Sequence, residues 1–223
     1  MRNPAGIPDL LPGELLERRR LVGALQQLFA AWGYLPVQPA ALEFAGASGP
    51  AGQVLLIDRS QVLALRSDYT QSVARIVATH YPQGPYPIRL QYDGKLWCES
   101  SDLTQRREST QCGLELIGPS TALADAEVIR LAAEAAQVMG LKDFRLELGH
   151  PGLVRAVLEG AGLVGEELEQ ARGLVHRKDQ VTLEKLVLSR GDRRVARAAA
   201  ALPELFGGAE VLQEARHLAL TAA

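Results

Sequence analysis

Two neighbouring stretches of this chain, PIRLQYDGKLWCE at residues 87–99 and RESTQCGLELIG at residues 107–118, determine how the rest of the sequence is interpreted. Both have the composition of β-strands, and turn-forming and charged residues lie between them. We interpret residues 87–99 and 109–117 as two strands joined by a loop from Ser100 to Glu108. This pair of strands is the expected centre of a sheet.

The sequence before these strands begins with a helical pattern. Leucines and a tryptophan recur at helical spacing over residues 13–32, and Gly33 is placed to end the helix. Residues 34–39 then predict an extended segment. Because this segment holds two prolines, which cannot donate to a central sheet ladder, we expect it at an edge or an interface.

A loop and a hairpin are predicted next. Residues 43–53 contain three closely spaced glycines and predict a flexible loop. Residues 54–57 and 61–65 are apolar runs on either side of a short polar turn, which is the signature of a β-hairpin. Thr70 is placed to cap the helix that follows.

Helices dominate the second half of the chain. We predict a helix over residues 122–139, a strand over 144–148 and four or five short helices between residues 152 and 220. A mixed antiparallel sheet with flanking helices, followed by an all-helical part, is typical of an α+β fold. We therefore predict a core over residues 1–150 and a helical segment over residues 151–223.

Composition excludes several classes of protein. A formal net charge of −2 offers no electrostatic reason to bind nucleic acid, and no apolar stretch is long enough for a signal sequence or a membrane span. The only cysteines, Cys98 and Cys112, favour a reducing cytoplasm over a disulfide framework, although a disulfide stays open if their strands are adjacent. The four histidines lack metal-ligand spacing, and no nucleotide-binding or nucleophile motif occurs, so we expect no metal and no cofactor.

Four segments, in order, resemble the histidyl-tRNA synthetase family of class II aminoacyl-tRNA synthetases. Gly6–Pro12 is similar to the opening segment of that family, and Leu65–Thr70 is similar to its Leu-Arg-Pro-Glu/Asp-x-Thr element. The two stretches quoted first are similar to motif 2. Trp32–Pro39 is similar to motif 1, and the resemblance implies that Pro39 lies at a dimer interface.

Three further segments are most similar to one branch of this family, the regulatory subunits of ATP phosphoribosyltransferase. They are residues 124–129, 141–150 and 202–208. The branch is non-catalytic. Its members pair with a short catalytic subunit that joins ATP to phosphoribosyl pyrophosphate in the first step of histidine biosynthesis.

The chain departs from the synthetase pattern where ATP would bind. Cys98 occupies the motif 2 position at which the family has an arginine that grips the α-phosphate, and a thiol cannot replace a guanidinium there. Asp102 would repel a triphosphate. Gly207-Gly208 is not followed by the arginine of motif 3, so the chain is expected to be a shortened family member or a fragment. Cys98 itself is expected to be a small buried residue beside Trp97.

Part of the family's histidine site is retained. Gln111 and Glu115 share a strand face and match residues that contact the bound histidine, while Asp68 and Thr70 match the element that binds its α-amino group. Two carboxylates and an amide suit an ammonium and an imidazole. The alternatives are that Gln111 and Glu115 form an ordinary polar face and that Asp68 caps the following helix.

The resemblance implies a cytoplasmic, non-catalytic regulatory subunit that assembles with a short ATP phosphoribosyltransferase, self-associates as a dimer and responds to free histidine. A second hypothesis is a histidyl-tRNA synthetase-like enzyme or fragment that activates histidine with ATP. A third is a dimerisation module that binds no amino acid. Fold alone does not decide among them.

Overall fold

A computed structural model describes residues 3–45, 52–100, 105–189 and 193–222. The chain forms two compact units, residues 1–146 and residues 147–223. A division after residue 150 into two domains remains a prediction, because contacts within one chain do not establish which part folds alone.

The two quoted stretches form the central strands of the first unit, as predicted. β5 (Ile88–Trp97) and β6 (Glu108–Ile117) are antiparallel over ten residue pairs, from Ile88 opposite Ile117 to Trp97 opposite Glu108. The short strand β1 (Leu35–Pro36) runs parallel to β5, which gives the order β1-β5-β6. The extended segment that contains two prolines therefore lies at a sheet edge, as its sequence predicts.

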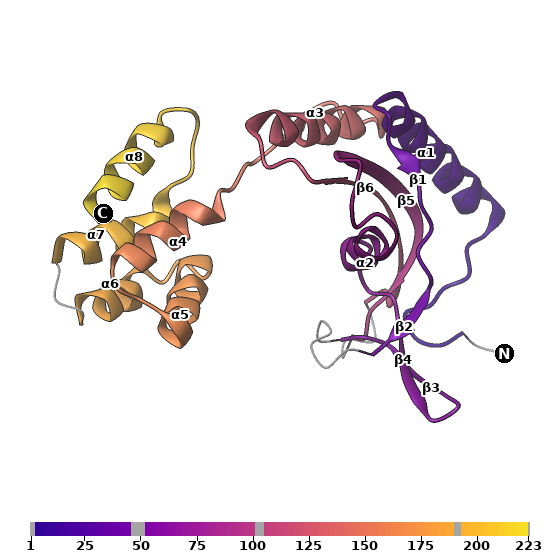
Figure 1. The fold of residues 1–223 in the computed structure, drawn as a ribbon, viewed down its shortest axis with the longest axis horizontal. Coiled ribbons are helices and arrows are strands. Elements are labelled where there is room, and N and C mark those ends of the chain that lie inside the picture. Colours follow the sequence, from indigo (N-terminus) through magenta and orange to yellow (C-terminus); the bar gives the residue numbers. More distant parts are fainter. Residues whose placement is uncertain (1–2, 46–51, 101–104, 190–192, 223) are drawn as a thin grey trace. The chain divides into compact units, whose positions relative to one another are not determined.

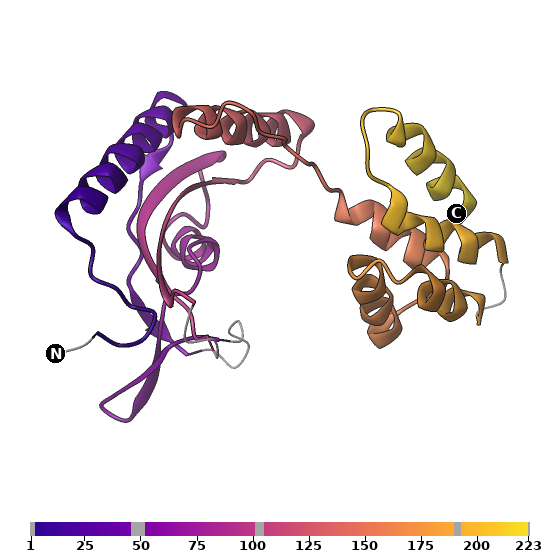
Figure 2. The ribbon, with the colours of Figure 1, turned by 180° about the vertical axis from the view of Figure 1, so that it is seen from behind.

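Helices cover both faces of this sheet (Figures 1 and 2). α1 (Pro12–Ala31) and α3 (Ala122–Val138) pack on one face, where Leu25, Phe29 and Leu131 are buried. α2 (Thr70–His80) packs on the other face. The even-numbered residues of β6 point toward α1 and α3, and the odd-numbered ones point toward α2. The side of β6 that carries Gln111 and Glu115 is therefore the side that faces α2.

A second, smaller sheet is built around the predicted hairpin. β3 (Leu55–Asp58) and β4 (Gln61–Leu65) are antiparallel, and the connecting residues Arg59 and Ser60 have positive φ angles, as a tight turn requires. β2 (Leu42–Phe44) pairs with the other edge of β4. The predicted loop over 43–53 was therefore wrong at its start, and residues 46–51 lie outside the described part.

Two local predictions were wrong. Residues 144–148 alternate apolar with polar side chains but form no strand, and all five are exposed. Alternation marks a strand only when a neighbouring strand supplies hydrogen-bond partners. Thr70 does not cap α2 with its side chain: Tyr69 is the N-cap residue, and the Asp68 carboxylate accepts the backbone N–H of Thr70.

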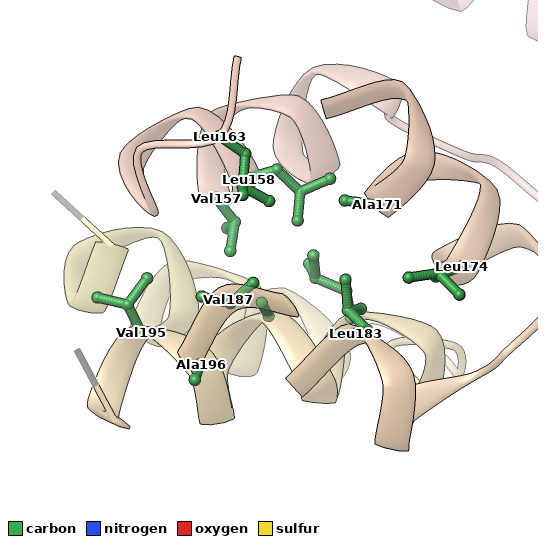
Figure 3. Packing of buried hydrophobic residues seen from close by; sticks show 11 residues of the cluster. Val157, Leu158, Leu163, Ala171, Leu174, Leu183, Val187, Val195 and Ala196 are labelled. Atoms are coloured by element: carbon green, nitrogen blue, oxygen red, sulfur yellow. The ribbon is translucent and has the colours of Figure 1, made fainter. Parts of the chain in front are cut away.

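The second unit is helical, as predicted. Figure 3 shows buried side chains from four of its helices pointing into one interior. Burial of each leucine or valine there contributes about 1.5–3 kcal/mol, which is enough to hold short helices together. Its elements are α4 (Pro151–Gly160), α5 (Gly165–His176), α6 (Gln180–Leu188), α7 (Arg193–Ala201), the 3-10 turn η1 (Leu202–Glu204) and α8 (Val211–Ala222).

Among the helices that the structure describes, none is long and apolar enough to cross a membrane.

An ion pair ties β5 to α3. The Arg89 guanidinium donates to both carboxylate oxygens of Glu127, over 2.8 Å and 2.7 Å, and the Tyr34 hydroxyl donates to the same carboxylate over 2.8 Å. The hydrogen bond from Arg89, together with that from Tyr34, holds the pKa of Glu127 below its usual value, against the effect of burial. This arrangement joins three segments of the first unit.

We expect Glu127→Gln to lower the free energy of unfolding of the first unit by about 1–2 kcal/mol at pH 7. Because the folded-state pKa of Glu127 is lowered, its contribution is present above the unfolded pKa of about 4.3 and is lost as the pH falls below it. The difference between wild type and variant should therefore shrink at pH 3.

Urea denaturation followed by tryptophan fluorescence measures this, since both tryptophans, Trp32 and Trp97, lie in the first unit. Glu17→Gln is the control, because Glu17 forms an exposed pair with Arg20 on α1 and should change little. Equal effects of the two substitutions would contradict the role given to Glu127.

Candidate functional site

The ladder of β5 and β6 places the predicted site residues on the α2 side of the sheet. Gln111 lies opposite Gly94, Gly113 opposite Tyr92, and Glu115 opposite Leu90. Gln111 and Glu115 are four residues apart on one strand, about 13 Å between Cα atoms, so they border the same face without being neighbours.

Three of the four predicted residues come together at the start of α2. The Thr70 hydroxyl donates to Glu115 Oε1 over 2.7 Å, and the Thr70 backbone N–H donates to the Asp68 carboxylate. The Tyr92 hydroxyl donates to the same Glu115 oxygen over 3.3 Å. We call Asp68, Thr70, Tyr92, Gln111 and Glu115 the acidic site.

Gln111 contributes a buried acceptor to this site. Its Oε1 atom is shielded from solvent and has no hydrogen-bond partner among the described residues. An unpaired buried carbonyl costs about 1–3 kcal/mol, so a bound donor group would stabilise it. The carboxylates of Asp68 and Glu115 are likewise acceptors. The acidic site therefore suits a cationic group that carries several N–H donors.

Tyr92 is buried between the sheet and α2. Burial, reinforced by the charge of the Glu115 carboxylate and the hydrogen bond to it, raises the pKa of the Tyr92 phenol. The phenol therefore stays protonated at neutral pH and acts as a donor to Glu115.

Tyr92 stacks on Tyr69, with ring centroids 4.2 Å apart and ring planes within 4°. The two rings lie over glycines of the sheet. A Cβ atom on Gly113 would be 2.7 Å from the Tyr92 hydroxyl oxygen, and one on Gly94 would collide with the Tyr69 hydroxyl. Only glycine at both positions lets the two rings lie against the strands.

Arg66 completes the stack from the other side. Its guanidinium lies 4.0 Å from the Tyr69 ring centroid and donates to the Tyr69 hydroxyl over 2.7 Å. It also donates to the backbone carbonyls of Pro39, Ala40 and Lys95 over 2.8–3.1 Å. Arg66 is only 5% exposed, and its hydrogen bonds within the described residues go to carbonyl oxygens and the Tyr69 hydroxyl, none to a carboxylate. Carbonyl dipoles and an aromatic ring stabilise this buried cation in place of a counter-ion.

Pro39 is buried within the chain, and Arg66 holds its carbonyl. The nearby exposed apolar surface belongs to the smaller sheet, where Phe44 is 74% exposed and Ile57 is 83% exposed. The assignment of Pro39 to a dimer interface stays a prediction.

Cys98 differs from its prediction. It is exposed and does not pack as a buried residue beside Trp97. Its backbone N–H donates to the Arg107 carbonyl, while Cys112 lies opposite Asp93. The two thiols are thus about five residues apart along the ladder, and both are free, so a disulfide between them is excluded in this fold. Burial raises the pKa of Cys112 to about 11, so its thiol is protonated. Asp102 lies outside the described residues.

A hollow of about 540 Å³ lies on the opposite face of the sheet, beside α3. Its walls include Arg89 and Arg130, but these already pair with Glu127 and Glu134. Unlike the acidic site, this hollow offers a ligand no uncompensated charge. No group of acidic, histidine and cysteine side chains within the described ranges is arranged to hold a metal ion.

Sequence reasoning missed the residues that support the acidic site, namely Arg66, Tyr69 and Tyr92. Arg66 and Tyr69 lie inside a recognised segment, and Tyr92 lies on the first quoted strand. The alternation of β5 places Tyr92 on the same face as Gly94, which is the one signal that points to the site. The stacking depends on contacts between α2 and β5, and no local pattern reports it.

The comparisons with known proteins agree with this fold. The model of the family described as histidyl-tRNA synthetase matches residues 6–223. The chain therefore belongs to the histidyl-tRNA synthetase family.

Within this family, similar relatives carry a more particular name. The chain is 44% identical to the ATP phosphoribosyltransferase regulatory subunit of Deinococcus radiodurans and 40% identical to that of Thermus thermophilus, in each case over 97% of its length. It covers 54% and 61% of those two proteins, so it spans a little over half of their length.

A solved structure is also similar. The crystal structure of an ATP phosphoribosyltransferase regulatory subunit/histidyl-tRNA synthetase from Bacillus halodurans matches 97% of this chain with a TM-score of 0.87 and 28% identity. This chain covers 59% of that one. The fold described above is thus a histidyl-tRNA synthetase-like fold.

The buried position of Arg66 leads to a stability prediction. We expect Arg66→Lys to lower the free energy of unfolding of the first unit by about 2–4 kcal/mol. The planar guanidinium of Arg66 donates to three backbone carbonyls and the Tyr69 hydroxyl, and the single ammonium of a lysine cannot reach all four acceptors. Urea denaturation followed by tryptophan fluorescence measures the loss. Arg75→Lys is the matched control, since Arg75 is about half exposed and forms a single pair with Glu43. A loss at position 66 no larger than at position 75 would contradict this account.

Proposed function

We propose that this chain is a non-catalytic regulatory subunit of ATP phosphoribosyltransferase, required for the first step of histidine biosynthesis. The observation that carries the proposal is Cys98. By the resemblance, this residue, just after β5, takes the place of the family's phosphate-binding arginine, while the acidic site on the same pair of strands keeps its acceptors. The names of the Deinococcus and Thermus relatives support the same proposal.

The loss of one arginine has a large effect on the chemistry. Phosphate binding needs charge-assisted hydrogen bonds, and removal of one such contact in a transition state typically costs about 3–4 kcal/mol. An exposed thiol at Cys98 offers neither the charge nor the two-point geometry. A fold that can still hold an amino acid but cannot position ATP suits a sensor better than a synthetase.

A second candidate is a histidyl-tRNA synthetase-like enzyme or fragment that activates histidine. Two observations favour this candidate. The matching family is described as histidyl-tRNA synthetase, and the similar Bacillus halodurans structure is named both as a regulatory subunit and as a histidyl-tRNA synthetase. It predicts histidine-dependent exchange between ATP and pyrophosphate, which the regulatory proposal does not.

The proposed partner is a short catalytic subunit of ATP phosphoribosyltransferase, and the same proposal puts the assembly in the cytoplasm. We also propose that the chain self-associates as a dimer through the smaller sheet and the adjoining Pro39 segment. Support comes from the apolar side chains that this sheet exposes on both faces, which need cover in water. They are Leu42, Phe44, Leu55, Leu56, Ile57 and Val62.

We propose that the ligand of the acidic site is free histidine. Its α-ammonium would lie between Asp68 and Thr70, and its side chain would bind as the imidazolium, whose two N–H groups donate to Glu115 and to the unpaired Gln111 oxygen. Support comes from the hydrogen bond that joins Thr70 to Glu115 and from the lack of a partner at Gln111 Oε1 within the described ranges. Histidine that binds one quaternary state more tightly would favour that state, which gives feedback control.

Assembly is the first test. We expect the chain alone to elute as a dimer, and the chain mixed with a short ATP phosphoribosyltransferase to elute as one larger complex with raised transferase activity. Size-exclusion chromatography with light scattering, followed by an activity assay, measures both. Histidine-dependent ATP–pyrophosphate exchange should remain at the level of a no-protein control.

Separate elution at micromolar concentration, with activity unchanged by mixing, would refute the regulatory assignment. Exchange clearly above the control would instead favour the synthetase alternative, whatever the elution profile.

Histidine binding is the second test. We expect Glu115→Gln and Asp68→Asn each to weaken histidine binding about ten- to a hundredfold, because each removes a charge-assisted hydrogen bond and keeps the shape of the side chain. Titration calorimetry measures the affinities.

Glu108→Gln is the matched control for this titration, since Glu108 lies on the same strand but on the opposite face. Equal affinity in wild type, both site variants and the control would mean that histidine binds elsewhere. No heat at millimolar histidine would mean that the acidic site binds no histidine.

A further inference from the structure

We propose that Tyr92 is the positioning residue of the acidic site: its hydroxyl fixes the Glu115 carboxylate in the orientation that a cationic ligand meets. This inference rests on the proposed binding of histidine and adds a residue to which neither the sequence nor the relatives assign a role. Tyr92 acts through Glu115 and needs no contact with the ligand.

Two hydrogen bonds orient the Glu115 carboxylate. Two hydroxyl groups, those of Thr70 and Tyr92, donate to one carboxylate oxygen, Oε1. No further hydrogen bond reaches Glu115 from the described residues, so Oε2 is left for a ligand. A carboxylate held through one oxygen by two donors has little rotational freedom, and the second oxygen therefore points in one direction.

Tyr92 is held rigidly. The residue is 6% exposed, and its ring stacks in parallel on Tyr69 and lies against Gly113 on the neighbouring strand. Tyr69 is held in turn by Arg66 and by its own hydrogen bond to the Asp93 carbonyl over 3.2 Å. The hydroxyl that meets Glu115 therefore belongs to a side chain that cannot change rotamer without breaking the whole stack.

A carboxylate that is already oriented favours binding. A site whose acceptors are already oriented loses less conformational entropy when the ligand arrives, and this preorganisation raises affinity. Tyr92 is also part of the core, as its burial shows. A test must therefore distinguish the effect of its hydroxyl on Glu115 from the effect of its ring on core packing. The hydroxyl and the ring can be separated experimentally, because phenylalanine keeps the ring and the stack.

The experiment is a double-mutant cycle on the 223-residue chain, with histidine affinity measured by calorimetry for wild type, Tyr92→Phe, Glu115→Gln and the double variant. We expect Tyr92→Phe to weaken binding about five- to tenfold in the wild-type background. In the Glu115→Gln background, where the carboxylate is absent, the same substitution should change affinity by less than about twofold.

A second variant displaces the Tyr92 hydroxyl by a substitution on the neighbouring strand β6. A Cβ on Gly113 would displace the Tyr92 ring, so Gly113→Ala should weaken histidine binding at least as much as Tyr92→Phe. Gly23→Ala is its control, since a Cβ there meets nothing within 4 Å. Near-ultraviolet circular dichroism shows whether each variant retains the packed aromatic stack.

Wild-type affinity in Tyr92→Phe, or the same loss in both backgrounds, would overturn the proposal, because either result means that Tyr92 does not act through Glu115. Absence of histidine binding in the wild type would overturn it together with the proposed ligand. The assembly test would still decide the regulatory function separately, because it does not depend on histidine.

Discussion

The first unit depends on one buried cation. Arg66 has no carboxylate partner among the described residues and is held by three backbone carbonyls, a phenol oxygen and an aromatic ring. A charge in such surroundings is stable only while all these groups stay in place, because an uncompensated buried charge costs several kcal/mol. Arg66 thus joins the segment after β1, the end of β5 and the start of α2. The acidic site is built where these segments meet.

The same surroundings bear on the proposal that this fold binds histidine but not ATP. The acceptors of the acidic site come from β6 and the start of α2, which the sheet ladder and the tyrosine stack hold in place. Cys98, which the resemblance to the synthetases places at the phosphate-binding position, lies just beyond the end of β5 and is exposed. An exposed side chain at this position takes no part in the core, so a substitution there leaves the packing of the fold unchanged. Under the proposed function, loss of ATP binding and retention of histidine binding are therefore physically independent.

Much of the fold could be predicted from local sequence. The helix before Gly33, the hairpin around Asp58 and the ladder of β5 and β6 all followed from periodicity and turn residues. The errors about strands have one common cause. Residues 144–148 alternate like a strand but find no partner strand, while Glu43 and Phe44, interpreted as the start of a loop, pair with β4 because β4 offers a free edge. Strand formation was decided by neighbours distant in sequence.

For the candidate site, the sequence by itself determined the chemical types: two acids, an amide and a hydroxyl, with a thiol at Cys98, where the resemblance to the synthetases implies a phosphate-binding arginine. It also determined that Gln111 and Glu115 share a face, because strand side chains alternate with a period of two. Only the tertiary structure decided that Thr70 and Tyr92 bind one oxygen of Glu115 and that Arg66 supports them through Tyr69. The physical reason is that the two contacts to Glu115 join residues 45 and 23 positions apart, and only the packing of α2 on the sheet brings them within hydrogen-bonding distance.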